Sequence, residues 1–165
     1  MLPEKRMTAE PPVTVDDLVL GLLYAEPDRP VKGGLMMMKL LFLIGKEIEP
    51  ELDQLLSFFP KDFGPFSQKV ASSLNRLEQT SLMSSRKSAA ESGDLERTDF
   101  RLTAQGKERA RLAFERLRPE TRAKIQQLRR GAEELGYSGI LRYVYSKYPE
   151  YADSSKIRED YQVDY

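Results

Sequence analysis

The 165-residue sequence predicts a mainly α (α+β) fold, in which an amphipathic helix is followed directly by a two-stranded ribbon. A turn with proline and glycine at 60–65 leads into a helix whose apolar residues recur at spacings of three and four. Two strand candidates, Leu82–Lys87 and Arg97–Leu102, then flank a loop of small and polar residues. This order is typical of a winged helix-turn-helix with a two-stranded β-wing, and the remaining sequence predicts additional C-terminal helices.

The length and composition indicate one domain. With 165 residues and 40% hydrophobic content, the chain can bury a single core. We expect a single winged-helix domain with a C-terminal helical extension at 13–151, between a disordered N-terminal arm at 1–12 and a polar tail at 152–165. No apolar run approaches the ~20 residues of a membrane span, and the N-terminus lacks the apolar segment of a signal peptide. The sequence therefore predicts a cytoplasmic protein with no membrane partner.

The residue inventory argues against enzyme chemistry. The chain has no cysteine and no histidine, which removes thiolate nucleophiles, imidazole acid–base catalysis and the usual transition-metal ligands. Phosphate-binding, zinc-protease and nucleophile-elbow motifs are missing too. The acidic pairs Asp16–Asp17 and Glu133–Glu134 are adjacent, so on a helix their side chains diverge by about 100°, and we interpret them as solvated charge. We expect a non-enzymatic protein with no catalytic residue, metal ion or cofactor.

The first predicted helix spans residues 15–25. Thr14 followed three residues later by Asp17 is typical of a capping pair, in which the side chains bond to free N–H groups of the first turn. Leucines and valines at helical spacing follow them. Two prolines and two glycines in 26–34 then predict a loop.

A central core helix is predicted at 35–48, because this segment is almost wholly apolar. Its run Met36–Met38 is interpreted as core filling, and a soft lining for a ligand is the alternative role. Pro50 starts a short third helix, which ends before Pro60.

The helix predicted at 67–79 carries the first group of candidate DNA-binding residues. Val70, Leu74 and Leu77 mark its buried face. The opposite face is polar, with side chains that suit base edges and phosphates: Gln68, Lys69, Ser72, Ser73, Asn75, Arg76 and Gln79, with one acid, Glu78. We predict DNA contacts for five of them: Gln68, Lys69, Ser72, Asn75 and Arg76. An ordinary solvated helix surface is the alternative interpretation.

The two strand candidates predict a wing that touches the DNA backbone. Four basic side chains in these strands would place positive charge against phosphates: Arg86, Lys87, Arg97 and Arg101. Acidic residues near the tip of the wing argue against deep insertion into a minor groove: Glu91, Asp94 and Glu96.

Two basic helices and a terminal helix follow the wing. Thr103 is the predicted N-cap of the first, Pro119 begins the second, and Gly136 ends it. Residues 103–147 carry 11 basic and 5 acidic side chains, although the net charge of the whole chain is zero. This excess suits phosphates, and it also suits ordinary solvated helix faces. The predicted apolar stripes are Leu112, Leu117, Ile125 and Leu128, and the residues expected outside are Arg122, Lys124, Arg129 and Arg130.

Four segments of the chain resemble known families: KLLFLIGKEI, FFPKDFGPFSQKV, LTAQGKERA and LRYVYSKYPEY. They cover about residues 35–151 and are similar to the poorly characterised YwgA-like prokaryotic winged-helix proteins and, more distantly, to SocA-like, Panacea-type antitoxin domains. FGPFS is the most specific motif, because its glycine and proline form the turn that aims the next helix. The first resemblance implies a winged-helix fold with no established activity. The second implies neutralisation of a toxin by protein contact.

The leading hypothesis is a DNA-binding transcriptional regulator whose helix at 67–79 enters the major groove. The alternative is a winged-helix protein–protein interaction module, such as an antitoxin, adaptor or accessory subunit in a defence or toxin–antitoxin system, and the pI of 6.4 favours it. The predicted partner is therefore double-stranded DNA or another protein, and either interpretation allows a homodimer through the terminal helices. A continuous positive face joining 67–79 and 103–147 would favour DNA, whereas separate faces would favour a protein.

Overall fold

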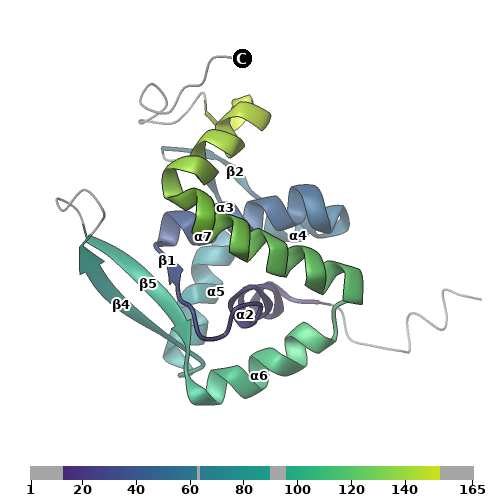
Figure 1. Cartoon of the computed structure of the whole chain (residues 1–165), viewed down its shortest axis with the longest axis vertical. Helices are drawn as coiled ribbons and strands as arrows, with labels where there is room; N and C mark the ends of the chain where they lie inside the picture. The colour runs from purple at the N-terminus through teal and green to yellow at the C-terminus, as the bar shows by residue number, and fades with distance from the viewer. Residues whose placement is uncertain (1–12, 63, 90–95, 153–165) are drawn as a thin grey trace, which may run out of the picture.

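The computed structural model of the chain describes residues 13–62, 64–89 and 96–152 (Figure 1). They form a mainly helical body with two small antiparallel sheets, which agrees with the predicted α+β class at this level of detail. The predicted arm at 1–12 lies outside the described residues, and so does the predicted tail at 152–165 apart from its first residue. Among the helices so described, none combines the length and the apolar character that a bilayer crossing requires.

Short strands are interspersed among the helices along the described chain. The α-helices are α2 (Val15–Tyr24), α3 (Gly34–Leu43), α4 (Asp53–Leu56), α5 (Gln68–Gln79), α6 (Ala104–Glu115) and α7 (Pro119–Lys147). Shorter helical turns are the π-helical η1 (Ile44–Ile48) and the 3-10 turns η2 (Pro50–Leu52) and η3 (Pro149–Tyr151). The strands are β1 (Val31–Lys32), β2 (Phe59–Lys61), β3 (Gly64–Phe66), β4 (Met83–Ala89) and β5 (Glu96–Leu102). In Figure 1, α2 is seen nearly end-on at the centre, with α6 below it, α7 above it and the β4–β5 ribbon projecting to one side.

Helix α2 begins with the predicted capping pair. The Asp17 amide donates to the Thr14 hydroxyl at 3.1 Å, and the Thr14 amide donates to the Asp17 carboxylate at 3.1 Å. Two donors of the first turn are thereby satisfied, and the predicted helix at 15–25 is confirmed to within one residue at its end.

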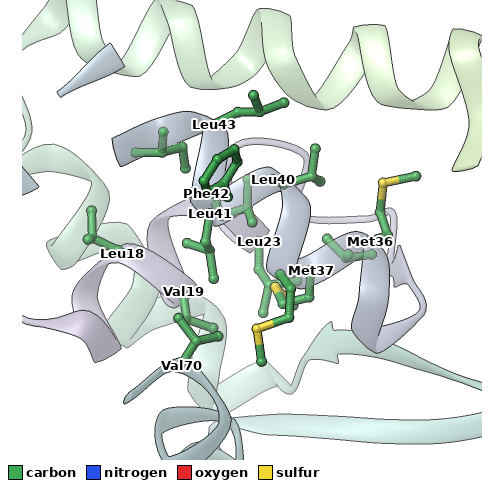
Figure 2. Close-up of a cluster of buried hydrophobic side chains, with 14 of the residues drawn as sticks. Leu18, Val19, Leu23, Met36, Met37, Leu40, Leu41, Phe42, Leu43 and Val70 are labelled. Carbon is green, nitrogen blue, oxygen red and sulfur yellow. The ribbon is translucent and has the colours of Figure 1, made fainter. Parts of the chain in front are cut away.

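Helix α3 forms the centre of the core, as its apolar sequence predicts. Met37 and Phe42 are fully buried, and Met36 and Met38 are nearly so, which confirms that the methionines fill the core. Figure 2 shows α3 side chains packed among Leu18, Val19 and Leu23 of α2 and Val70 of α5. The α-helix ends at Leu43 and widens into the π-helical turn η1, where the sequence predicted one continuous helix.

A small hairpin occupies the region of the predicted tight turn at 61–65. Strands β2 and β3 pair antiparallel, with Pro60 opposite Pro65 and Lys61 opposite Gly64, and the sequence analysis did not predict either strand. Gly64 has φ of 106°, and a Cβ there would lie 3.2 Å from the Tyr145 ring. Glycine is therefore needed here both for backbone conformation and for close packing.

The second sheet contains the two strands predicted as a wing. Strand β4 pairs antiparallel with β5 along its length, from Met83 opposite Leu102 to Ala89 opposite Glu96. Strand β1 pairs with the other edge of β5, with Val31 opposite Phe100, so the strand order is β1-β5-β4. The sequence analysis placed β1 in a loop, because two residues are too short to show strand periodicity.

Hydroxyl groups cap the helices that follow, at the predicted N-cap Thr103 and at Ser67, which the sequence analysis had included in the helix itself. The Ser67 hydroxyl accepts from the Val70 amide at 3.1 Å, and the Thr103 hydroxyl accepts from the Gly106 amide at 2.8 Å. Helix α7 is interrupted at Gly136, where φ is 71° and ψ is 178°. The predicted helix end at this glycine is confirmed as a break between two helical segments.

Two predictions about the basic helices are wrong. Arg129 was expected outside but is only 2% exposed, and its guanidinium donates to the Leu22, Leu23 and Arg29 carbonyls at 2.8, 3.2 and 2.8 Å. These acceptors lie at and beyond the C-terminal end of α2, where helix carbonyls lack helical partners. Leu112 was expected in the apolar stripe of α6 but is 48% exposed. The buried face of α6 contains instead Gly106, Ala110, Ala113 and Phe114.

Candidate nucleic-acid interface

Helix α5 is held rigidly at the start of the candidate interface. The Ser67 hydroxyl caps the helix and also donates to the Leu56 carbonyl of α4 at 2.5 Å. Val70 and Leu77 are buried, as predicted, and Leu74 is half-buried. The apolar face thus fixes the rotation of α5 about its axis and turns its polar residues outward.

The polar face of α5 is narrower than the sequence indicated. Gln68, Lys69, Asn75 and Arg76 are exposed, and Ser72 is half-buried. Ser73 was predicted on this face, but it is fully buried and donates a hydrogen bond of 2.5 Å to Asp16. The reason is that position 73 lies one helical turn after Val70 and therefore faces α2.

An open groove of about 490 Å³ brings four of the predicted α5 residues together with residues of two other helices. From α5 come Gln68, Lys69, Ser72 and Arg76. The start of α2 contributes Thr14, Val15 and Asp16, and α6 contributes Arg109. Asn75 is exposed but does not line this groove. We call this surface the α2–α5–α6 groove.

The α2 wall of the groove holds Arg76 through a carboxylate. Arg76 donates to both oxygens of Asp16, from Nε at 3.1 Å and from Nη2 at 2.6 Å. Burial by itself would raise the pKa of Asp16, but the hydrogen bonds from Arg76 and Ser73 outweigh it and lower this pKa. Arg76 therefore has a fixed position on the rim of the groove.

The interpretation of Asp16 and Asp17 as solvated charge is wrong. Asp16 joins α2 to α5 through Arg76 and Ser73. Asp17 is 6% exposed and accepts from Arg116 at 3.2 Å, in addition to its capping bond. The two carboxylates do diverge around the helix, as adjacent residues must, but each meets a partner on a different neighbouring helix.

The wing residues that were predicted to contact DNA lie on both faces of the β4–β5 hairpin. Cross-strand pairs share a face, so Arg86 lies with its partner Asp99, and Arg101 lies with Ser84 on that same face. Lys87 lies on the opposite face, which carries Met83 into the core. Arg86, Lys87 and Arg101 are all exposed. Arg97 belongs to β5, and its side chain lies outside the described part, as do Glu91 and Asp94 at the tip.

Most of the basic excess of 103–147 is engaged within the molecule. Ion pairs join Lys107 to Asp28, Arg111 to Glu108 and Glu115, Arg116 to Asp17, Arg118 to Glu49, Arg130 to Glu26, and Lys147 to Glu47. Arg122, expected outside, donates to the Glu115 and Leu117 carbonyls. Arg109, Lys124 and Arg142 are the cations of this segment that make neither an ion pair nor a hydrogen bond to a carbonyl among the described residues, and Arg109 lines the groove.

Sequence reasoning identified the α5 side of this groove and missed the other two walls. Asp16 was recognised as part of an acidic pair, and Arg109 was counted only as one of eleven basic side chains in 103–147. Neither carries a local signal that points towards α5. Their positions depend on how α2 and α6 pack, which no sequence pattern within either helix specifies.

The chain was compared with known families and proteins. No family model matches it, and no curated protein matches it. Within the described residues, no group of three or more acidic side chains is arranged to hold a metal ion. The candidate site is therefore assessed on its geometry and charge.

Proposed function

We propose that the protein is a winged-helix protein that binds double-stranded DNA and acts as a transcriptional regulator. The observation that carries this proposal is the α2–α5–α6 groove, because it gathers four of the five α5 residues predicted to contact DNA. Its donors are a lysine, two arginines, two hydroxyls and an amide, which are side chains that bind phosphates and base edges.

The arrangement of helix and sheet supports the winged-helix part of the proposal. An exposed polar helix, α5, leads directly into the β4–β5 hairpin, and a short early strand pairs with β5 to give the order β1-β5-β4. A winged helix needs a recognition helix, a following hairpin and a short strand that anchors the hairpin to the body. The resemblance to YwgA-like proteins points to the same fold.

Charge within the groove supports an anionic partner. Lys69, Arg76 and Arg109 face one carboxylate, Asp16, which gives the lining a net charge of +2. Lys69 and Arg109 make no ion pair within the described side chains. Such cations attract phosphates chiefly by releasing condensed counterions, so binding should weaken steeply as the salt concentration rises.

The alternative function is contact with another protein, in line with the resemblance to antitoxin domains. Two observations favour it: the ion pairs that neutralise most of the basic excess, and the exposed hairpin β2–β3, on which Phe59 is 45% exposed. Aromatic residues at the surface are frequent anchors of protein interfaces. We rank this function second because polar and charged residues form most of the groove lining and their net charge is positive.

A salt titration tests the proposed function. We would follow the fluorescence anisotropy of a labelled random-sequence duplex at several salt concentrations, with the wild-type protein and with Lys69→Ala. We expect wild-type binding that weakens with salt, and about threefold to tenfold weaker binding by Lys69→Ala. Lys124→Ala is the matched control, because Lys124 is also an exposed lysine without an ion pair but does not line the groove. Absence of wild-type binding at low salt would contradict the DNA function.

A further inference from the structure

The groove is lined in part by Arg109 of α6, a helix outside the helix–hairpin unit. We propose that the groove seats phosphate groups of one DNA strand between Lys69 of α5 and Arg109 of α6, so that α6 forms part of the interface. This inference rests on the proposed function and adds to it the path of the nucleic-acid backbone. Neither the amphipathic pattern of α6 nor its net charge distinguishes Arg109 from its neighbours.

Arg109 differs from the other arginine on the exposed part of α6. Arg111 donates to Glu108 at 2.5 Å and to Glu115 at 3.1 Å, so its charge is compensated on its own helix. Residues two positions apart on a helix point about 200° apart, so Arg109 faces away from this network. Arg109 is exposed, lines the groove and makes no ion pair within the described side chains. Its charge is therefore available to an external anion.

The charges that line the groove influence one another. Burial raises the pKa of Asp16, the hydrogen bonds from Arg76 and Ser73 lower it, and the positive charge of Arg109 contributes further to this lowering. Arg109 therefore acts on the same space as Arg76 and Asp16, although it belongs to a different helix. Because Arg76 already compensates Asp16, Lys69 and Arg109 supply the net positive charge of the lining.

The shape and chemistry of the groove fit a phosphate chain better than a small apolar ligand. Pockets for small ligands are usually enclosed and mostly apolar, whereas this groove is open and Val15 is its one aliphatic lining residue. Ser72 and Gln68 add hydroxyl and amide donors between the cations. A volume of about 490 Å³ exceeds that of a single phosphate group and suits a stretch of sugar–phosphate backbone.

The decisive test compares Arg109→Ala with Arg111→Ala, two identical changes on the same helix. Both variants would be checked for folding by circular dichroism and then titrated with the labelled duplex across a salt series. We expect Arg109→Ala to weaken binding about threefold to tenfold and to reduce the slope of log Kobs against log salt by about 1. We expect Arg111→Ala to match the wild type. If the two variants bind the duplex with equal affinity and equal salt dependence while the wild type still binds, Arg109 of α6 does not hold a phosphate. The proposed DNA-binding function would remain.

A second measurement tests phosphate binding in the groove independently of DNA binding. Free phosphate esters share the chemistry of the DNA backbone, so pyrophosphate would be titrated into the isotope-labelled protein while backbone amide signals are recorded. We expect saturable shifts at Gln68, Ser72 and Arg109 that disappear in Arg109→Ala. If the wild type shows these shifts but binds no duplex, the groove binds phosphate groups and the proposed DNA-binding function is wrong. If neither pyrophosphate nor duplex acts on the groove, both proposals fail.

Discussion

The α2–α5–α6 groove and the contact between α7 and the body are both rich in basic side chains, yet the two regions use them differently. In the α7 contact, Arg129 is buried with three carbonyl acceptors, and Arg118 pairs with the buried Glu49. In the groove, Lys69 and Arg109 are exposed and make no ion pair among the described residues. The count of basic residues therefore measures neither available charge nor binding capacity.

Burial is the physical reason for this difference. A charged group removed from water must be matched by hydrogen bonds or opposite charge, so the buried Arg129 and the buried Glu49 each need the partners that they have at the α7 contact. Burial lowers the pKa of Arg129, but a guanidinium remains charged at neutral pH and needs its acceptors. Cations of the groove keep their hydration and are free to exchange it for a phosphate.

The strongest disruption of the groove is expected at Gly106, which sets the position of α6. A Cβ at residue 106 would lie 1.7 Å from the Leu82 carbonyl oxygen, so Gly106→Ala must push α6 away from the start of β4. We expect a loss of about 3 kcal/mol or more in the free energy of unfolding, measured by urea denaturation. Gly131→Ala in α7 is the control, because its Cβ would meet nothing within 4 Å. A stability of Gly106→Ala equal to that of this control would contradict the packing described here.

At the α7 contact, the corresponding change is Arg129→Ala. It would leave three backbone carbonyls without their donor, and we expect a loss of about 3 kcal/mol in the free energy of unfolding. Arg130→Ala removes the neighbouring arginine, which is exposed and 3.5 Å from Glu26, and should change stability by no more than about 0.5 kcal/mol. Thermal unfolding of both variants measures the difference. Similar melting temperatures would show that Arg129 does not hold the fold.

A buried lysine gives a further test of the difference between buried and exposed cations, because its burial should make the free energy of unfolding depend on pH. Lys39 in α3 is fully buried, and burial lowers its pKa to about 7. The unfolded lysine keeps its proton up to about pH 10, so folding releases a proton between these values and rising pH favours the folded state. We expect the free energy of unfolding to rise by about 2 kcal/mol from pH 7 to pH 9 relative to Lys39→Met. Parallel pH profiles of the two proteins would refute this protonation change.

The smallest expected effect concerns the carboxylate within the groove. Asp16→Asn removes a negative charge beside the proposed phosphate seat and loosens Arg76, so duplex binding should tighten about threefold. The same change removes a bridge between α2 and α5 and should cost about 1 kcal/mol of stability. Asp28→Asn removes an equal charge from the exposed partner of Lys107, outside the groove. Anisotropy titrations should show no tightening for this control, and a weaker Asp16→Asn complex would assign Asp16 a supporting role instead.

Local sequence signals predicted the elements whose formation depends on near neighbours. The predicted capping residues Thr14 and Thr103 lie where helices begin, and Gly136 lies where α7 breaks. These features depend on backbone groups within a few residues, so the pattern and the structure coincide. The paired strands of the hairpin also followed from local sequence, because a short loop joins them.

Features that join distant segments were decided by tertiary structure. Strand β1 forms because Val31 pairs with Phe100, and Ser73 is buried because it meets Asp16, 57 residues earlier in the chain. Arg129 becomes a core residue because α7 crosses the end of α2, whose carbonyls are 107 and 106 residues away.

The α2–α5–α6 groove likewise combines features set by local sequence with features set by tertiary packing. The sequence alone determined most of the side chains that α5 presents to solvent, because helical periodicity places Val70 and Leu77 inside and Lys69 and Arg76 outside. Only the packing of α2 and α6 decided that Asp16 fixes Arg76 and that Arg109 lines the same groove as Lys69. Periodicity describes one helix in relation to the core, whereas a groove depends on the relative placement of several helices, which results from the packing of the whole core.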